Sequence, residues 1–186
     1  MRFVLFVEGS TEKKALPAFF KRWLDPQLTS PVGIKVVRFD GWQDYLRDVA
    51  KKVRRHLNDP DAGEIIGAIG LIDLYGPTLY PSTTTTAAQR YDWARNHFTN
   101  LVGDSRFRQH FAVHETEAWL LSDPSILPVQ LPASCAQPET VNFGQPPARL
   151  LNDLYKRQLK RPYKKLADGY NLFTKLAPEA ARKKCP

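Results

Sequence analysis

Acidic side chains stand directly after apolar runs at several places in this 186-residue sequence. The first follows the run FVLFV and opens the stretch EGSTEK, in which a second acid lies four positions further on. A carboxylate in an apolar setting is costly without a partner, and several together repel one another unless a cation lies between them. Oxygen ligands of this kind suit a hard divalent ion, Mg²⁺ first and Mn²⁺ or Ca²⁺ next. The acids in question are Glu8, Glu12, Asp73, Glu115 and Glu117.

These acids can meet only if the fold brings their segments together, and the hydrophobic pattern indicates how. The apolar runs 3–7 and 64–73 are continuous, which is typical of strands buried on both faces of a parallel sheet. Between the runs, apolar residues recur with helical spacing. The pattern predicts strands over 3–7, 34–39, 64–73 and 111–113, and helices over 11–24, 42–57, 87–101 and 114–121. This alternation predicts an α/β fold with a central, mostly parallel sheet of about four strands flanked by helices.

The acids follow the carboxyl ends of the predicted strands. Ligands of open α/β sheets bind beyond these ends, because the loops converge there and the helix amino termini point outward. Neighbouring parallel strands would therefore bring Glu8, Asp73 and one of the later glutamates to one edge. We expect Glu8 to be a metal ligand or a general acid or base, and Gly9 to let the backbone approach a phosphate closely.

Structural roles are open for some of these residues. A glutamate in a first helical turn is favoured by the helix dipole, so Glu12 is either a second ligand or a stabiliser of the helix start. Asp73 could instead accept hydrogen bonds from the amides of a turn. His114 could exchange protons near neutral pH, but a single histidine at a strand-to-helix junction is more often a capping or packing residue. Glu115 and Glu117 are two positions apart and cannot share a helix face, so at most one should face the site.

The C-terminal part of the chain carries all of its excess positive charge. Residues 148–186 contain eleven Lys or Arg and three acids, whereas residues 1–147 contain sixteen of each sign. A basic segment beside clustered acids is typical of a polyanion-binding protein with a metal site, although a solvated helical surface would have the same composition. The aromatic residues of this part would either stack on unpaired bases or pack against the body. They are Tyr155, Tyr163, Tyr170 and Phe173.

One domain with an appended basic extension is the expected organisation. A chain of this length supports one substantial core. We expect that core over residues 1–123, and over 124–186 a connection and a helical basic extension packed on the same domain. Six prolines between 124 and 147 predict an irregular connection. Helices are expected over 148–160 and 169–184, with a break at Arg161-Pro162.

Several classes of protein are disfavoured by what the sequence lacks. No apolar run approaches the roughly 20 residues that span a bilayer, and the N-terminus has no secretory pattern, so a cytoplasmic location is expected. Cys135 and Cys185 have no metal-ligand spacing, and we expect both to be free thiols. The sequence contains no nucleophile elbow, Walker loop, dinucleotide fingerprint or zinc-binding spacing.

The stretch VEGSTE, residues 7–12, resembles the first motif of the Toprim fold, which occurs in topoisomerases, bacterial primases and the OLD-family nucleases. In Toprim proteins the first glutamate and later acids hold Mg²⁺ for phosphoryl transfer, and the resemblance implies this role for Glu8 and Asp73. Many members have Asp-x-Asp as the second motif. Here Asp73-Leu74-Tyr75 places a tyrosine at the second acid, so that ligand is absent from its usual place.

A closer resemblance covers nearly the whole chain, to a family of small stand-alone Toprim-like bacterial proteins of uncharacterised function. The shared motifs are VEG-x-TE, Asp73-x-Tyr75-Gly76, Glu115-x-Glu117-Ala118 with Ser122-Asp123, Pro147-Ala148-Arg149, Tyr163-Lys164-Lys165 and Cys185-Pro186. Relatives of this type resemble defence-associated nucleases that work beside a separately encoded ATPase. The resemblance therefore implies a setting in phage defence and an ATPase partner.

Together these observations predict a Mg²⁺-dependent nuclease that hydrolyses phosphodiester bonds in DNA or RNA. The expected catalytic residues are Glu8, Asp73, Glu117 and Lys165; the expected metal ligands are Glu8, Glu12, Asp73, Glu117 and Asp123. Arg149, Lys164 and Lys165 are expected to hold the phosphate backbone, in the way basic residues do in sequence-independent binding. The rival interpretation is a non-catalytic regulatory subunit that binds metal and a nucleotide or nucleic-acid end at the same place.

Overall fold

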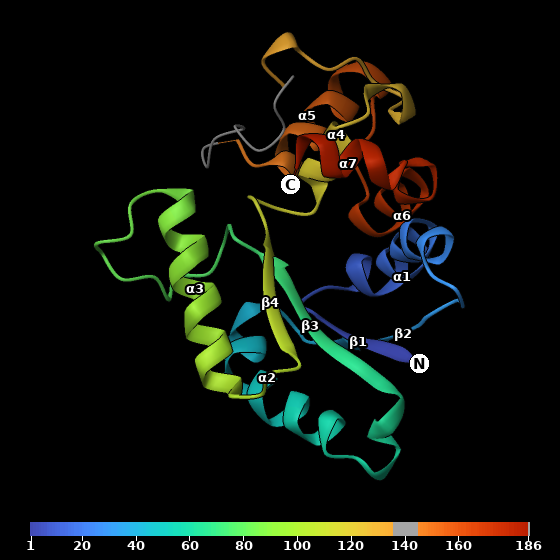
Figure 1. Ribbon diagram of the computed structural model, residues 1–186. Coiled ribbons are helices and arrows are strands. Elements are labelled where there is room, and N and C mark those ends of the chain that lie inside the picture. Colours follow the sequence, from blue (N-terminus) through green and yellow to red (C-terminus); the bar gives the residue numbers. More distant parts are fainter. Residues whose placement is uncertain (136–144, 186) are drawn as a thin grey trace.

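A four-stranded parallel sheet forms the centre of the computed structural model, which describes residues 1–135 and 145–185 (Figure 1). Its strands are β1 (Arg2–Val7), β2 (Gly33–Arg38), β3 (Ile65–Asp73) and β4 (Phe107–Ala112). They lie in the order β2-β1-β3-β4, and every neighbouring pair is parallel. The predicted fold class, an α/β fold with a central parallel sheet of about four strands flanked by helices, is confirmed.

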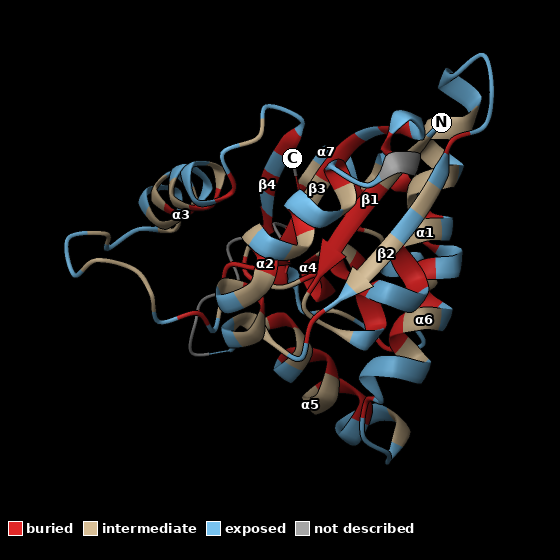
Figure 2. Ribbon diagram, turned by 90° about the horizontal axis from the view of Figure 1, so that it is seen from below, coloured by how far each residue is buried: buried red, intermediate tan, exposed pale blue. Residues whose placement is uncertain are grey.

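Alternation along the strands divides the core into two layers. Val4 and Phe6 of β1 pack on one face with side chains of α2 (Trp42–Leu57) and α3 (Ala87–Val102). Leu5 and Val7 pack on the other face with α1 (Ser10–Leu24) and the C-terminal helices. Figure 2 shows the central strands as the most buried part of the molecule and β2 as a partly exposed edge.

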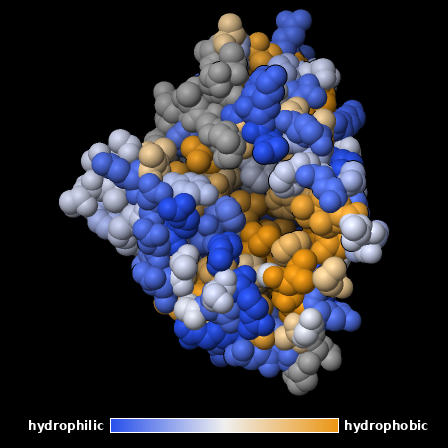
Figure 3. Space-filling model, in the orientation of Figure 1, coloured by the Kyte–Doolittle hydropathy of each residue, from blue (hydrophilic) through white to orange (hydrophobic). Residues whose placement is uncertain are grey.

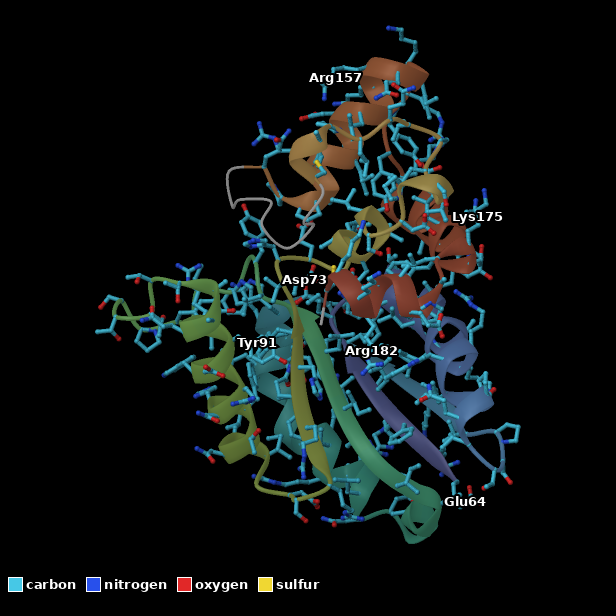
Figure 4. The ribbon with its side chains drawn as sticks, turned by 45° about the horizontal axis from the view of Figure 1, so that its top comes forward. Glu64, Asp73, Tyr91, Arg157, Lys175 and Arg182 are labelled. Atoms are coloured by element: carbon cyan, nitrogen blue, oxygen red, sulfur yellow. The ribbon has the colours of Figure 1, made fainter. Side chains whose placement is uncertain are left out.

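Four helices after β4 gather beyond the carboxyl ends of the strands (Figure 1). They are α4 (Glu117–Leu121), α5 (Pro147–Leu159), α6 (Lys165–Lys175) and α7 (Pro178–Lys184). α6 packs along α1, and α4 contacts α5, α6 and α7. Figure 4 marks the two ends of β3: Asp73 lies next to these helices, and Glu64 lies at the far end. The basic extension therefore covers the edge of the sheet at which the acids were expected.

Three predicted boundaries are wrong, and two of the errors have a clear physical reason. β4 begins at Phe107 rather than 111, because this edge strand alternates buried and exposed side chains instead of forming an apolar run. The predicted helix 114–121 starts only at Glu117. The predicted helix 169–184 is two helices, since α6 ends at Lys175 and Pro178 begins α7, where its missing N–H costs nothing.

Short 3₁₀ turns lie in several of the described connections, whereas residues 74–86 between β3 and α3 form a longer loop. They are η1 (Asp25–Gln27), η2 (Pro60–Glu64), η3 (Pro124–Ile126) and η4 (Ala133–Cys135). The predicted irregular connection 124–147 lies partly outside the described residues. Pro186 lies outside them. Cys135 and Cys185 are buried and are not joined in a disulfide, as expected. Among the described residues no helix is long and apolar enough to cross a membrane.

Candidate acidic site at the carboxyl end of the sheet

The two central strands, β1 and β3, separate at their carboxyl ends. Val7 of β1 pairs with Leu71 of β3, and this is the last register pair between them. Beyond it, the backbone oxygen of Glu8 accepts a hydrogen bond from Gly41, on the β2 side. The Leu74 amide instead donates to Ala112, on the β4 side. β1 and β3 thus diverge at the topological switch point, where open α/β sheets bind their ligands.

Four acids from four chain segments gather where these strands diverge. Glu8 follows β1, Glu12 lies in the first turn of α1, Asp73 ends β3 and Glu117 begins α4. The exposed fractions of Glu12, Asp73 and Glu117 are 4%, 6% and 0%, and Glu8 is half-buried. Burial of this many carboxyl groups is unfavourable by itself, because each loses its hydration. Some other interaction must therefore hold the cluster together.

Thr116 links two of the buried acids. Its amide donates to Asp73 Oδ1 over 3.0 Å, and its hydroxyl donates to Glu12 Oε1 over 3.0 Å. Thr116 is itself 1% exposed. The residue before α4 thereby fixes the end of β3 and the start of α1 relative to each other. The sequence gives little signal for this role, because the hydroxyl and its acceptor are 104 residues apart.

Lys165, the first residue of α6, supplies positive charge to the cluster. Its Nζ lies 3.1 Å from Glu117 Oε2 and 4.0 Å from Asp73 Oδ2. Although partial burial acts to lower the pKa of Lys165, the carboxylates of Glu117, Asp73 and Glu12 raise it above its usual range. Lys165 therefore carries its charge at neutral pH. One ammonium facing four acids leaves the cluster short of positive charge.

Glu8, Asp73 and Glu117 have raised pKa values. Burial, with the neighbouring Glu12 carboxylate, raises the pKa of Glu8 to about 7. Burial also raises the pKa of Glu117 to about 7, although Lys165 acts in the opposite direction. The pKa of Asp73 is raised well above its usual range, mainly by burial. Because these carboxyl groups act on one another, each of the three takes up a proton at a higher pH than an isolated carboxyl group does.

Gly9 makes room for one member of the cluster. A Cβ atom added there would collide with Glu12 Oε2. The carboxylate of Glu12 thus folds back over the start of its own helix, as the helix dipole favours. The glycine between the two acids has a steric reason that is independent of any phosphate.

The oxygen donors of the cluster fit a divalent cation in their chemistry. Glu8 Oε2 and Glu117 Oε1 are buried and have no hydrogen-bond partner. Carboxylate oxygens are the ligands that Mg²⁺ and Mn²⁺ prefer. Within the described part of the chain, no three Asp, Glu, His or Cys side chains converge closely enough to form a ready metal site. The donors are present, and the Lys165 ammonium lies against two of the acids.

Other candidate residues have hydrogen-bond partners of their own. Asp123 Oδ1 accepts hydrogen bonds from the amide and hydroxyl of Ser125, where it caps η3, so we leave it out of the ligand set. Glu115 accepts from the Ala148 amide at the start of α5, over 2.8 Å, so it acts as a helix cap. Besides burial, which is the main cause, the charge of Glu115 also helps to raise the pKa of Glu117 and of Glu8. His114 is buried, and its backbone oxygen accepts from the Tyr75 amide.

The predicted nucleic-acid-binding cations are exposed around the cluster. Arg149 is exposed in the first turn of α5, the helix that Glu115 caps. Lys164 is exposed and directly precedes α6. The aromatic residues of the extension mostly pack inward: Tyr155, Tyr163 and Phe173 are buried, and Tyr170 lies under the Lys14 ammonium. Packing, not base stacking, is the use that this arrangement gives them.

Tyr163 is a neighbour of the cluster that motif reasoning did not place there. Its hydroxyl is buried without a hydrogen-bond partner. Burial and the charge of Glu117 raise the pKa of Tyr163 above its usual range. The signal in the sequence is only its position two residues before Lys165.

The fold and the site define an α/β protein with a buried acidic cluster at the switch point of a parallel sheet. The chain belongs to the family described as Domain of unknown function (DUF4276), which matches residues 7–186. No match is found among curated proteins.

Two solved structures are similar to this chain at low sequence identity. One is the C-terminal region of the Burkholderia pseudomallei OLD protein: 17% identity, TM-score 0.46, covering 97% of this chain and 94% of that one. The other is the C-terminal region of the Xanthomonas campestris pv. campestris OLD protein: 17% identity, TM-score 0.35, covering 97% and 92%. At these values the likeness assigns neither a reaction nor site residues to this chain.

Proposed function

We propose that this chain is a Mg²⁺-dependent nuclease that hydrolyses phosphodiester bonds in DNA or RNA. The observation that supports it best is the gathering of Glu8, Glu12, Asp73 and Glu117 from four segments at the point where β1 and β3 diverge. Acids so crowded and so poorly supplied with positive charge favour a divalent cation. Exposed cations beside them favour a substrate with a phosphate backbone.

In this proposal Glu8, Asp73 and Glu117 hold the metal ion. When bound, the ion would polarise the scissile phosphate and offset its negative charge. A carboxylate that holds the ion is deprotonated, so in this proposal the proton of the attacking water passes to the surrounding solvent. The water oxygen then bonds to phosphorus as the bond to the leaving sugar oxygen breaks, and that oxygen takes up a proton.

The cationic side chains have two roles in this proposal. Lys165 lies among the acids and would stabilise negative charge that develops on the phosphate oxygens. Arg149 and Lys164 are exposed beside the cluster and would hold the nucleic-acid backbone without reading its sequence. A cytoplasmic location, an ATPase partner and a role in phage defence belong to the same proposal. The resemblance carried by the motif around Glu115 and Glu117 supports the partner and the defence role.

A cleavage assay combined with metal binding tests the proposal. Purified protein is incubated with end-labelled single-stranded DNA, duplex DNA and RNA in Mg²⁺, Mn²⁺ or EDTA. Cleavage is expected only with metal, and Glu8→Gln should abolish it. Glu64→Gln is the matched control, because Glu64 is an exposed acid at the opposite end of the sheet. Calorimetric titration with Mn²⁺ follows binding independently of activity, and cleavage that persists in Glu8→Gln contradicts the proposed role.

A second candidate function is a non-catalytic subunit that binds metal and a nucleic-acid end. Two observations favour it: Tyr75 stands where the second acid of the second motif is usual, and the Lys165 ammonium is already paired with Glu117. This candidate predicts Mn²⁺ and oligonucleotide binding that both weaken in Glu8→Gln, with no cleavage of any polymer. Cleavage that requires Glu8 excludes it.

A further inference from the structure

The two faces of the sheet are covered unequally. α2 and α3 pack on one face along its length. On the other face, α1 covers the β1–β2 side, and in Figure 1 no helix lies in front of β3 and β4. A parallel sheet of an α/β protein normally has helices on both faces, because its strands expose apolar side chains on each. Among the residues that the structure describes, no helix covers half of this face.

A hollow of about 430 Å³ marks the uncovered half of the sheet. Its floor includes Leu5 of β1, Ile69 and Leu71 of β3, and its walls include Trp23 of α1 and Tyr91 of α3. Figure 3 shows this face as a hydrophobic recess below the C-terminal helices. In Figure 4, Tyr91 and Arg182 stand on either side of β3 and β4. We call this recess the apolar hollow.

Positive charge borders the apolar hollow. None of the described residues that line it is acidic, and Arg182 is among them; burial lowers the pKa of His110, which also lines it, so His110 does not count as a cation. Arg108, on the same face of β4 as His110, is exposed as well. Arg108 bonds backbone oxygens and Arg182 lies over the Trp23 ring, and within the described residues neither forms an ion pair. An occupant with negative charge at its edges would complement this rim.

We propose that the apolar hollow is the docking site for an amphipathic α-helix of a partner protein, with an apolar stripe bordered by Asp or Glu. Neighbouring strands lie about 4.8 Å apart, so the width of three strands is close to the 10–12 Å diameter of a helix. The docked helix would complete the missing layer and place its acids near Arg108 and Arg182. Recognition of this kind uses anchors at positions i, i+3, i+4 and i+7.

Two other occupants fit the charges and the shape less well. A second copy of the chain would bring a net charge of +8 against another +8, with an arginine rim on each side. A lipid surface attracts cations, but a recess presents no protruding apolar side chains to insert into it. Both remain as outcomes that the experiment separates from helix docking.

The test measures binding of a designed probe peptide by fluorescence anisotropy. The probe is a fluorescein-labelled amphipathic helix with a Leu stripe flanked by Glu, and its two controls are a peptide of the same composition with scattered Leu and a peptide with Lys in place of Glu. We expect the probe to bind at least about tenfold more tightly than either control. Equal binding of all three, or no binding of the probe, overturns the proposal.

Protein variants locate the site and guard against misfolding. Ile69→Glu should weaken probe binding about tenfold or more, and Ile66→Glu should not, because Ile66 is 44% exposed on the same strand but does not line the hollow. Arg182→Glu, an exposed change on α7, should shift the preference toward the Lys-flanked peptide. Circular dichroism confirms folding of each variant.

Two further results would assign the hollow to another occupant and overturn the proposal. One is concentration-dependent dimerisation of the wild-type chain, seen by light scattering and lost in Ile69→Glu. The other is co-sedimentation with phosphatidylserine vesicles that is lost in the same variant. The proposal is also contradicted if Arg182→Glu binds the Glu-flanked and Lys-flanked peptides with the same order of affinity as the wild type.

Discussion

The two ends of β3 carry the same kind of charge in opposite surroundings. At the carboxyl end the Asp73 side chain is 8% exposed, and it contacts Lys165 and the Thr116 amide. At the amino end, the side chain of Glu64 is 69% exposed, and its Oε2 lies 3.8 Å from Arg2 Nη1. Burial raises the pKa of Asp73, whereas Glu64 lies in solvent. A carboxylate becomes a functional candidate here because it is kept from water beside other acids.

The largest difference between the two ends should appear in catalysis. If the proposed nuclease function holds, Asp73→Asn should lower the cleavage rate roughly 100-fold or more, because it removes a charge that holds the metal ion. Glu64→Gln should leave the rate within about twofold of wild type, since exposed substitutions away from a site have little effect. Initial rates under saturating Mg²⁺ measure both. Similar losses in both variants would remove the distinction between the two ends.

The contribution of Lys165 to stability is the next largest expected effect. Lys165→Met should lower the free energy of unfolding by about 2 kcal/mol at pH 8 in EDTA, because the buried acids lose their cation. This value is smaller than that for a fully buried ion pair, because the Lys165 side chain is 44% exposed. Urea denaturation followed by circular dichroism measures it. Lys164→Met is the control, because Lys164 is exposed and should change stability by less than about 0.5 kcal/mol.

Metal addition sharpens the Lys165 prediction. A divalent ion that binds the acids should restore much of the stability that Lys165→Met loses, since binding to the folded state stabilises it. If Lys165→Met has the same free energy of unfolding as the wild type in EDTA, the acids do not contact Lys165 in solution.

The acidic cluster should also set how stability depends on pH. Glu8 and Glu117 have an ordinary pKa of 4.5 and a folded pKa of about 7, so the folded chain binds more protons between these values. The free energy of unfolding should therefore fall as pH rises through this window. We expect Glu117→Gln to reduce that fall by about 1 kcal/mol between pH 5 and 7.5 in EDTA. Glu64→Gln should leave the pH profile unchanged, and a profile that rises with pH and is unaltered by Glu117→Gln contradicts the assignment.

Much of this comparison follows from strand patterning alone. Continuous apolar runs predict buried parallel strands, and residues that end neighbouring parallel strands must lie near one another, which brings Glu8 close to Asp73. The amino end of β4 escapes prediction because its polar residues alternate at an edge. Thr116 escapes it because its link to Glu12 depends on how α4 packs against α1, which no local pattern encodes.

The position of Lys165 illustrates the same limit in the extension. A break at Pro162 is visible in the sequence, but the start of α6 is fixed by Asp168, whose carboxylate accepts from the Lys164 amide over 2.7 Å. Asp168 also binds Arg161 through both of its oxygens. This local network holds the first residue of α6 beside the acids. The resemblance of the Tyr163-Lys164-Lys165 motif indicates a basic site, and only the fold gives Lys165 its acidic partners.

The smallest expected effect concerns nucleic-acid binding at the two ends of the sheet. Arg149 is exposed on α5 beside the acidic cluster, and Arg55 is exposed near the end of α2, which leads toward the start of β3. Arg149→Ala should weaken oligonucleotide binding about two- to fivefold and lower the slope of log affinity against log salt by about one, because one phosphate contact is lost. Arg55→Ala should change neither. Anisotropy titrations in Ca²⁺ over a range of NaCl concentrations measure the affinity and the salt slope of both variants. Equal effects of the two substitutions would mean that the nucleic acid is attracted by the net charge of the protein and is not bound at the carboxyl end of the sheet.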